Sequence, residues 1–158
     1  MFSPKSVKAL EIFSPAIGKC IGIEDVKDEL FSNRVLGDGA AIIPIGNTFH
    51  SPVDGTLVMI AETNHAFGVA SENGVSILVH IGIKTVNLNG RGFTRLVDTG
   101  GKIKQGDQII QIDREQIPKN TDLTTSIIIT QSFSDRLEKH NQNKIVSTKD
   151  LILHIGNQ

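Results

Sequence analysis

Residues 66–81 read AFGVASENGVSILVHI, which is two apolar runs separated by Glu-Asn-Gly at residues 72–74. Asn-Gly between two apolar runs is typical of the tight turn of a β-hairpin. We therefore expect residues 66–71 to pair antiparallel with residues 75–81. This hairpin is the first predicted unit of the fold.

The rest of the chain repeats the alternation of short apolar runs and turn residues. Asp-Gly at 54–55, Asn-Gly at 89–90 and Gly-Asp at 106–107 are turn signals between the runs. Short strands at such regular spacing predict an all-β protein, an antiparallel β-sandwich or barrel. Besides the hairpin, the expected strands cover residues 58–61, 108–112, 126–130 and 151–155.

Helical periodicity is scarce in this sequence. Short helical turns are expected only at residues 25–32 and 132–139. We expect residues 1–11 to form an N-terminal tail and residues 12–158 a single domain, because no linker or low-complexity stretch divides the chain.

Two sequence patterns occur twice. Ser-Pro-x-x-Gly is found at residues 14–18 and 51–55, each time before an apolar stretch. An aspartate flanked by Ile or Val at matching positions is found at residues 103–112 and again at 146–155. These patterns indicate an internal pseudo-repeat, and the alternative is chance similarity between short strand-turn units.

Composition excludes several classes of protein. The 158 residues carry a net charge of −1, lack Trp and Tyr, and contain no Lys/Arg-rich run, so no nucleic-acid partner is expected. No apolar window is long enough to span a membrane. Cys20 is alone, which excludes a disulfide framework and fits a cytoplasmic location.

The sequence also lacks the common motifs for nucleotide and hydrolase chemistry. It has no Walker A loop, no Gly-x-Gly-x-x-Gly before a helix, no Gly-x-Ser-x-Gly and no His-Glu-x-x-His. No cofactor and no bound metal are therefore predicted. A phosphoryl donor for this chain has to be another protein.

The hairpin brings two histidines together. His65 precedes its first strand and His80 ends its second, so both lie at the same end of neighbouring strands. Facing imidazoles can share a phosphoryl group, a proton or a metal ion, and a neutral imidazole is a nucleophile near neutral pH. A backbone carbonyl near Gly82 is a candidate to fix the His80 tautomer. The alternative is that both histidines are structural, and we expect His140 and His154 to be solvated and outward-facing.

An ordered set of segments resembles the glucose-type enzyme IIA family of the bacterial phosphoenolpyruvate-dependent sugar phosphotransferase system. The most specific are Thr-Asn-His-Ala-Phe at 63–67 and Val-His-Ile-Gly-Ile at 79–83. Leu-Asn-Gly-x-Gly-Phe at 88–93 and Leu-Gly-Asp-Gly-Ala-Ala-Ile at 36–42 support them. The resemblance extends from about Ile12 to Ile155 and implies an antiparallel β-sandwich.

The resemblance also implies roles for individual residues. His80 matches the histidine that accepts a phosphoryl group from the phosphocarrier protein HPr and passes it to a cysteine of a sugar-specific enzyme IIB domain. His65 matches the second active-site histidine, and Thr63 matches a threonine that organises the pair. A carrier that presents one face to successive partners is expected to be a monomer.

Partner contacts are expected around this pair, at Asp38, Phe67, Gly82, Lys84 and Arg91. Lys84 stands where the family usually has Asp, and Arg91 where it commonly has Glu. These reversals suggest a different donor or acceptor, direct stabilisation of phosphohistidine by Lys84, or a mainly regulatory role.

Two other functions compete with phosphoryl transfer. In the first, the phosphorylation state controls binding to permeases or kinases, through the same face around His65 and His80. In the second, the histidine pair holds the zinc of a peptidase. Catalytic zinc normally has three protein ligands, and no third ligand stands at a suitable spacing in the sequence.

Overall fold

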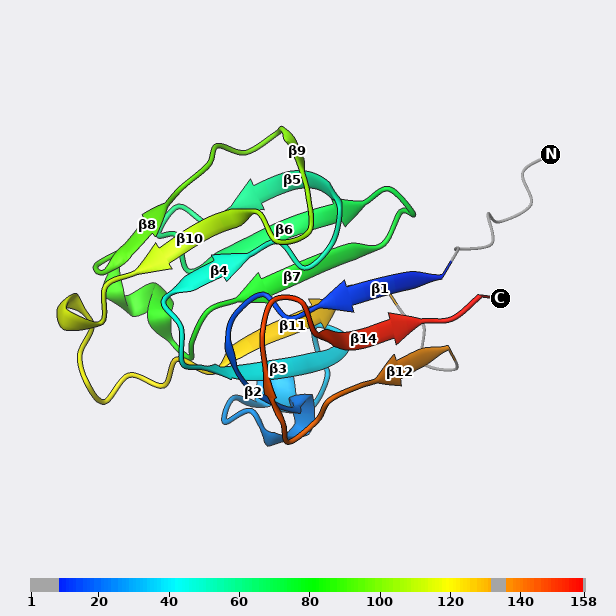
Figure 1. Ribbon diagram of the computed structural model, residues 1–158. Helices are drawn as coiled ribbons and strands as arrows, with labels where there is room; N and C mark the ends of the chain where they lie inside the picture. The colour runs from blue at the N-terminus through cyan, green and yellow to red at the C-terminus, as the bar shows by residue number, and fades with distance from the viewer. Residues whose placement is uncertain (1–8, 132–135, 158) are drawn as a thin grey trace.

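Antiparallel sheets in two layers form the fold in the computed structural model, which describes residues 9–131 and 136–157 (Figure 1). The larger sheet has eight strands, and each pairs antiparallel with its neighbours. In spatial order they are β13 (Ile145–Val146), β2 (Gly18–Gly22), β3 (Asp38–Pro44), β11 (Thr125–Ile129), β7 (Ser76–His80), β6 (Ala66–Ser71), β5 (Gly55–Ile60) and β9 (Lys102–Ile103).

Two three-stranded sheets lie over one face of the larger sheet (Figure 1). One has the order β1 (Leu10–Phe13), β14 (Leu151–Ile155) and β12 (Leu137–Lys139). The other has the order β4 (Thr48–His50), β10 (Gln108–Ile112) and β8 (Phe93–Arg95). The core between the layers includes the fully buried side chains of Phe49, Leu57, Phe67, Ile77 and Ile109. The predicted antiparallel β-sandwich is confirmed.

Helical structure in the described residues is short. It consists of η1 (Ile23–Asp25), α1 (Glu29–Ser32), η2 (Thr85–Leu88) and η3 (Arg114–Gln116). The helical turns predicted within 25–32 are confirmed. The helical prediction for 132–139 is wrong at residues 137–139, which form β12, and residues 132–135 lie outside the described residues. Residues 137–139 are extended because they pair with β14. Pairing between segments far apart in the chain cannot be recognised from the local sequence.

The first strand begins earlier than the expected domain boundary. Leu10 and Glu11, which were expected in the tail, belong to β1 and stand opposite Ile155 and His154 of β14. Residues 1–8 of the expected tail lie outside the described residues. A four-residue strand that mixes polar and apolar side chains gives a weak sequence signal.

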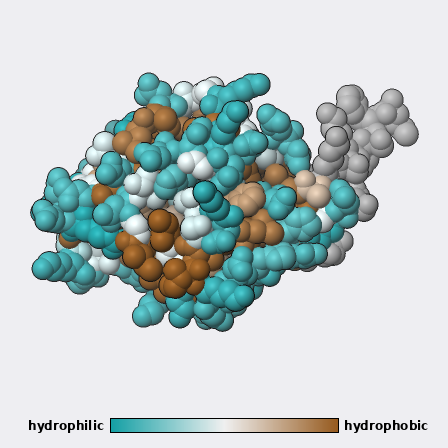
Figure 2. All heavy atoms as spheres, in the orientation of Figure 1, coloured by the Kyte–Doolittle hydropathy of each residue, from teal (hydrophilic) through white to brown (hydrophobic). Residues whose placement is uncertain are grey.

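The face shown in Figure 2 is mostly hydrophilic, and one of its hydrophobic patches lies over the ends of β2 and β3. Exposed isoleucines on and beside these strands are Ile17, Ile43, Ile45 and Ile145. The patch interrupts the alternation of inward apolar and outward polar side chains that an antiparallel sheet normally shows.

The repeated sequence patterns occupy equivalent places in the two halves of the fold. The Ser14 N–H donates to the Asp150 carbonyl at 3.0 Å, and the Ser51 N–H donates to the Asp107 carbonyl at 2.9 Å. Each aspartate carboxylate also accepts the N–H of the residue three positions before it, at 2.9 Å for Asp107 and 2.8 Å for Asp150. The pseudo-repeat is therefore structural, since chance similarity would not reproduce the same hydrogen bonds.

The glycine that ends each Ser-Pro-x-x-Gly copy is required for space. A Cβ atom on Gly55 would lie 2.1 Å from the backbone oxygen of Ala70, and one on Gly18 would lie 2.2 Å from that of Ile43. These oxygens belong to paired strands and cannot move aside as the end of a flexible side chain can. The neighbouring strand therefore crosses each glycine too closely for any other residue.

We expect Gly55→Ala to lower the free energy of unfolding by about 3 kcal/mol, the upper end of the range for overpacking, because the clash is with backbone. The measurement is a urea denaturation curve, in which the midpoint falls while the slope stays unchanged. Gly101→Ala is the matched control, since a Cβ there has no described atom within 4 Å. Equal midpoints for the two variants would contradict the steric argument.

Candidate functional site

His80 is the last residue of β7 and is held by the backbone that follows it. Its Nδ1 lies 2.9 Å from the carbonyl oxygen of Gly82. A carbonyl only accepts, so Nδ1 carries the proton and Nε2 keeps its lone pair. Gly82 makes this bond in the left-handed region, at φ +80°, where glycine is favoured. The acceptor predicted from the sequence is confirmed.

His65 lies directly before β6 and faces His80. The two ring centroids are 5.1 Å apart with an interplanar angle of 77°. In the β6–β7 pair, Ala66 stands opposite His80, and the Ile81 N–H donates to the His65 carbonyl at 2.7 Å. The predicted hairpin therefore brings the two imidazoles together.

Thr63 contacts the His65 ring through its hydroxyl. Its Oγ1 lies 2.6 Å from His65 Nδ1. Each histidine therefore uses Nδ1 for a contact with the protein. Among the described residues, no side chain or backbone group hydrogen-bonds Nε2 of His65 or His80, so both nitrogens are available for a ligand.

Burial keeps both imidazoles neutral. Burial lowers the pKa of His65. The pKa of His80 is lowered first by burial and second by electrostatic repulsion from His65. The hydrogen bond to Gly82 and the carboxylate of Asp28 oppose the shift of His80 but do not outweigh it. A neutral His80 presents a nucleophilic Nε2 near neutral pH.

Two further residues of this site were missed by the sequence interpretation. The ring of Phe31, from α1, has its centroid 5.0 Å from that of His80. Asp28 caps α1 through a 3.0 Å hydrogen bond from the Leu30 N–H, and its charge acts on His80. The segment that contains both residues was predicted only as a helical turn, and nothing in its local sequence indicated that it packs against the histidines.

Lys84 lies on the rim of the site. It is exposed, precedes η2 with φ +58°, and lines an open depression with Asp28, Leu30 and Val35. Arg91 is exposed in the turn between η2 and β8. Both side chains are therefore accessible to a partner.

Asp38 lies away from the histidines. Ser126 of β11 stands opposite both His80 and Ala41, and Asp38 lies three residues before Ala41, at the start of β3. Its carboxylate pairs with Lys139 at 2.8 Å and with Arg34 at 3.1 Å. Burial raises the pKa of Asp38, but these cations and the Gly39 N–H outweigh it and leave the pKa below its usual value. Asp38 therefore takes part in ion pairs away from the histidines, and Asp28 is the carboxylate whose charge acts on His80.

Two other expected partner contacts are buried. Phe67 is fully buried in the core between the sheets. Gly82 is buried as well and contributes the carbonyl that anchors His80. Neither residue is exposed, so burial contradicts the expected partner contact at Phe67 and at Gly82.

A zinc peptidase site does not form around the histidine pair. Among residues 9–131 and 136–157, the group of three His, Cys, Asp or Glu side chains with ligand atoms close together is Glu138, His140 and His154. It includes neither His65 nor His80. Within the part of the chain that the structure describes, the histidine pair therefore lacks the third protein ligand of a catalytic zinc site.

Residues 10–134 match the family described as phosphoenolpyruvate-dependent sugar phosphotransferase system, EIIA 1. The chain belongs to this family. EIIA components are phosphotransferases that move phosphoryl groups between proteins during sugar uptake, which agrees with two neutral imidazoles whose Nε2 atoms are free. No helix within the described residues is long and apolar enough to cross a membrane.

Relatives and a solved structure support this assignment. The glucose-specific EIIA component of Haemophilus influenzae is 38% identical over 156 residues, which is 97% of this chain and 94% of that protein. The solved structure of glucose permease IIA from Mycoplasma capricolum superposes with a TM-score of 0.85 at 37% identity and covers 93% of this chain and 96% of that one. The N-acetylglucosamine-specific EIICBA component of Escherichia coli is 37% identical over 132 residues, 84% of this chain but 20% of that protein.

Proposed function

We propose that His80 accepts a phosphoryl group from HPr and passes it to a cysteine of a sugar-specific IIB domain. The observation that carries this proposal is the Nδ1 bond to Gly82, which leaves the Nε2 lone pair of His80 free. That lone pair attacks phosphorus, and the bond from phosphorus to the donor breaks with its electron pair left on the donor. Transfer to IIB repeats the exchange with a thiolate as nucleophile.

In this proposal His65 stabilises the phosphoryl group. We assign the Thr63 hydroxyl, 2.6 Å from His65 Nδ1, as the donor of this hydrogen bond, which places the proton of His65 on Nε2. An N–H at this place donates to a phosphoryl oxygen, where charge accumulates during transfer. Thr63 acts through His65 and is a positioning residue.

The surface around His80 suits docking of more than one protein. Leu30, Val35, Leu36 and Val86 are exposed apolar side chains on the elements that frame the site. Apolar contacts can serve successive partners because they need no fixed hydrogen-bond geometry. We therefore assign HPr and IIB to the same face, with Lys84 and Arg91 on its rim.

The names of related proteins support proposals for the phosphoryl acceptor and the type of sugar. In the Escherichia coli protein named EIICBA, an EIIA segment shares one chain with EIIB and EIIC components, which supports a IIB acceptor for this chain. The Haemophilus influenzae relative is named glucose-specific, and we propose a glucose-type sugar. We further propose a monomer that works in the cytoplasm, where HPr and the IIB domains are found.

The test is phosphorylation of the purified protein with phosphoenolpyruvate, enzyme I and HPr, read by intact mass. A gain of one acid-labile phosphoryl group supports the proposal. If a folded sample gains none while a control carrier does, phosphoryl transfer from HPr is excluded. The regulatory interpretation, in which the same face docks on permeases or kinases, then takes its place.

We expect Lys84→Asp to raise the rate of phosphorylation by a basic HPr surface by about fivefold at low salt, since an opposite-charge contact in place of a like-charge one is worth about 1 kcal/mol at an exposed site. The effect falls as salt is added. Lys102→Asp is the matched control, because Lys102 pairs with Thr56 at the end of β5 far from Ala66 and His80. Equal rates for wild type and Lys84→Asp would show that this position does not select the donor.

A further inference from the structure

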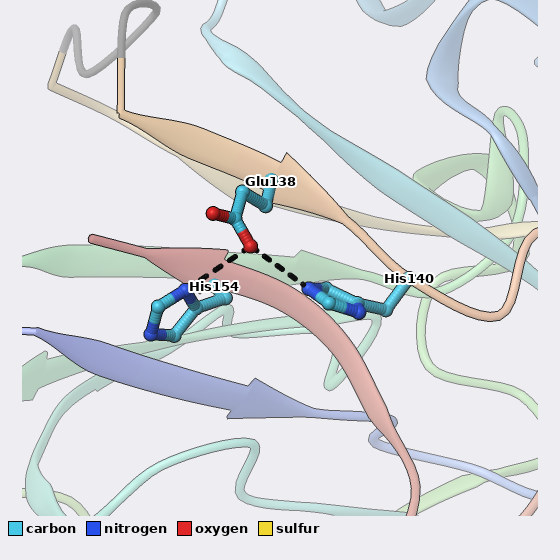
Figure 3. Close-up of side chains that lie close together, drawn as sticks. All are labelled: Glu138, His140 and His154. Carbon is cyan, nitrogen blue, oxygen red and sulfur yellow. Dashed lines mark hydrogen bonds and ion pairs between the residues drawn. The ribbon is translucent and has the colours of Figure 1, made fainter.

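Three side chains with metal-ligand chemistry meet on the small sheet that contains β14. Glu138 of β12 stands directly opposite His154 of β14, and the His140 N–H continues the ladder to the Ile152 carbonyl at 2.9 Å. Residues 138 and 140 therefore share one face of the sheet with His154. Figure 3 shows the Glu138 carboxylate between the two imidazoles.

The distances in this cluster approach those of a metal site. Glu138 Oε2 lies 3.4 Å from His140 Nε2 and 3.5 Å from His154 Nδ1. Zinc held by bonds of about 2.0–2.2 Å in a tetrahedron separates its ligand atoms by roughly 3.3–3.6 Å. The three ligand atoms all lie within 4.8 Å of one another, so a ring rotation closes the remaining gap between the two histidines.

We propose that Glu138, His140 and His154 bind a divalent transition-metal ion, with Zn²⁺ as the ion that fits them. Two imidazole nitrogens and one carboxylate oxygen are a donor set that suits zinc, whereas Mg²⁺ and Ca²⁺ prefer oxygen ligands alone. Three protein ligands leave the fourth position to water. This site is separate from the phosphotransfer histidines, which lie on the larger sheet.

The backbone around the cluster is already held in place. The Lys139 ammonium, on the other face of β12, pairs with Asp38 at 2.8 Å. The Asn141 side-chain amide donates to the Leu151 carbonyl at 2.7 Å. Residues on both sides of His140 are therefore anchored, so binding an ion requires movement of side chains alone, and preorganisation of this kind favours affinity.

Charge and access also favour a cation at this place. Glu11 of β1 stands opposite His154 on its other side, so a second carboxylate lies on the same face of the sheet. The side chains of Glu138 and His140 are 62% and 39% exposed, and that of His154 is 28% exposed. An ion from solvent can reach the cluster without opening the core. Once bound, it links β12 to β14 and stabilises the folded chain by mass action.

The test is calorimetric titration of the metal-free 158-residue chain with ZnCl₂. Because the histidine pair of the phosphotransfer site can also bind zinc, the titration uses a His65→Gln/His80→Gln background. We expect one equivalent to bind, and we expect His154→Ala or His140→Ala to weaken it by more than about 100-fold, since loss of even an outer-shell partner costs 10–100-fold. His50→Ala, outside the cluster, is the control and keeps the affinity.

Two further measurements separate coordination from damage to the fold. Glu138→Gln leaves the exposed position filled by a side chain of the same size, and we expect it to weaken zinc by about tenfold. Co²⁺ in place of Zn²⁺ should give the visible absorption of a four-coordinate site in the background protein and none in the His140→Ala variant. Equal zinc affinity in all variants, or no difference in the Co²⁺ spectra, would overturn the proposal.

Discussion

We expect His80→Ala to abolish phosphorylation of the protein by phospho-HPr, with a rate at least about four orders of magnitude below wild type, because loss of a nucleophile has effects of this size in other enzymes. The Nε2 lone pair of His80 is fixed by the Gly82 carbonyl. His65 cannot replace it, because the Thr63 hydroxyl that we propose as donor to Nδ1 places the proton of His65 on Nε2. The intact mass after incubation with phosphoenolpyruvate, enzyme I and HPr measures the result.

The control for this experiment is a histidine outside the phosphotransfer site. His140→Ala should gain the full phosphoryl mass, since His140 lies on the sheet of β1, β14 and β12, away from the pair. The His80 ring packs against Phe31, so circular dichroism is needed to show that His80→Ala is folded. A phosphoryl group gained by a folded His80→Ala protein would assign the nucleophile to another residue.

The hairpin of β6 and β7 was predictable because its information is local. An Asn-Gly turn fixes the register of two short strands, and the register alone places Ala66 opposite His80. The Gly82 acceptor was predictable for the same reason, since it lies two residues from His80 in the chain. The histidine pair follows from residues 63–82, whereas Asp28 and Phe31 reach His80 from a distant segment.

The partner-facing residues could not be predicted in this way. Asp38 looks like a free carboxylate in Gly-Asp-Gly, but Lys139, far along the chain, neutralises it. Phe67 lies only two residues after His65, which suggested a place at the site. It belongs to β6, which lies between β7 and β5 and is buried over most of its length, so its side chains do not alternate between core and solvent. Burial and long-range ion pairs depend on which strands lie next to a residue, and the local sequence does not predict these neighbours.

The cluster of Glu138, His140 and His154 could not be predicted because the secondary structure expected for part of it was wrong. Residues 132–139 were expected to turn helically, and in a helix positions 138 and 140 point in different directions. In the extended chain of β12 they share a face, and the register with β14 brings His154 beside them. One change of local conformation therefore converts three scattered polar residues into a ligand set.

The second large effect is expected at His65. We predict that His65→Gln still accepts the phosphoryl group on His80, because the nucleophile and its Gly82 anchor are untouched. We predict that its onward transfer to a IIB domain falls by about 10²–10³-fold, the effect of removing one donor from a site that stabilises developing negative charge. Gln has a side chain of similar length, but it lacks the Nε2–H that the Thr63 contact at Nδ1 fixes in an imidazole.

The measurement is single-turnover loss of phosphohistidine after fully phosphorylated protein is mixed with the IIB domain. Thr63→Val is the graded companion, because it keeps the imidazole and removes only the hydroxyl 2.6 Å from His65 Nδ1. Its transfer rate should lie between wild type and His65→Gln, since the ring remains but its tautomer is no longer held. Equal transfer by wild type and His65→Gln would remove His65 from the reaction. A failure of His65→Gln to accept the group at all would move its role to the first transfer, and in both cases His80 stays the carrier.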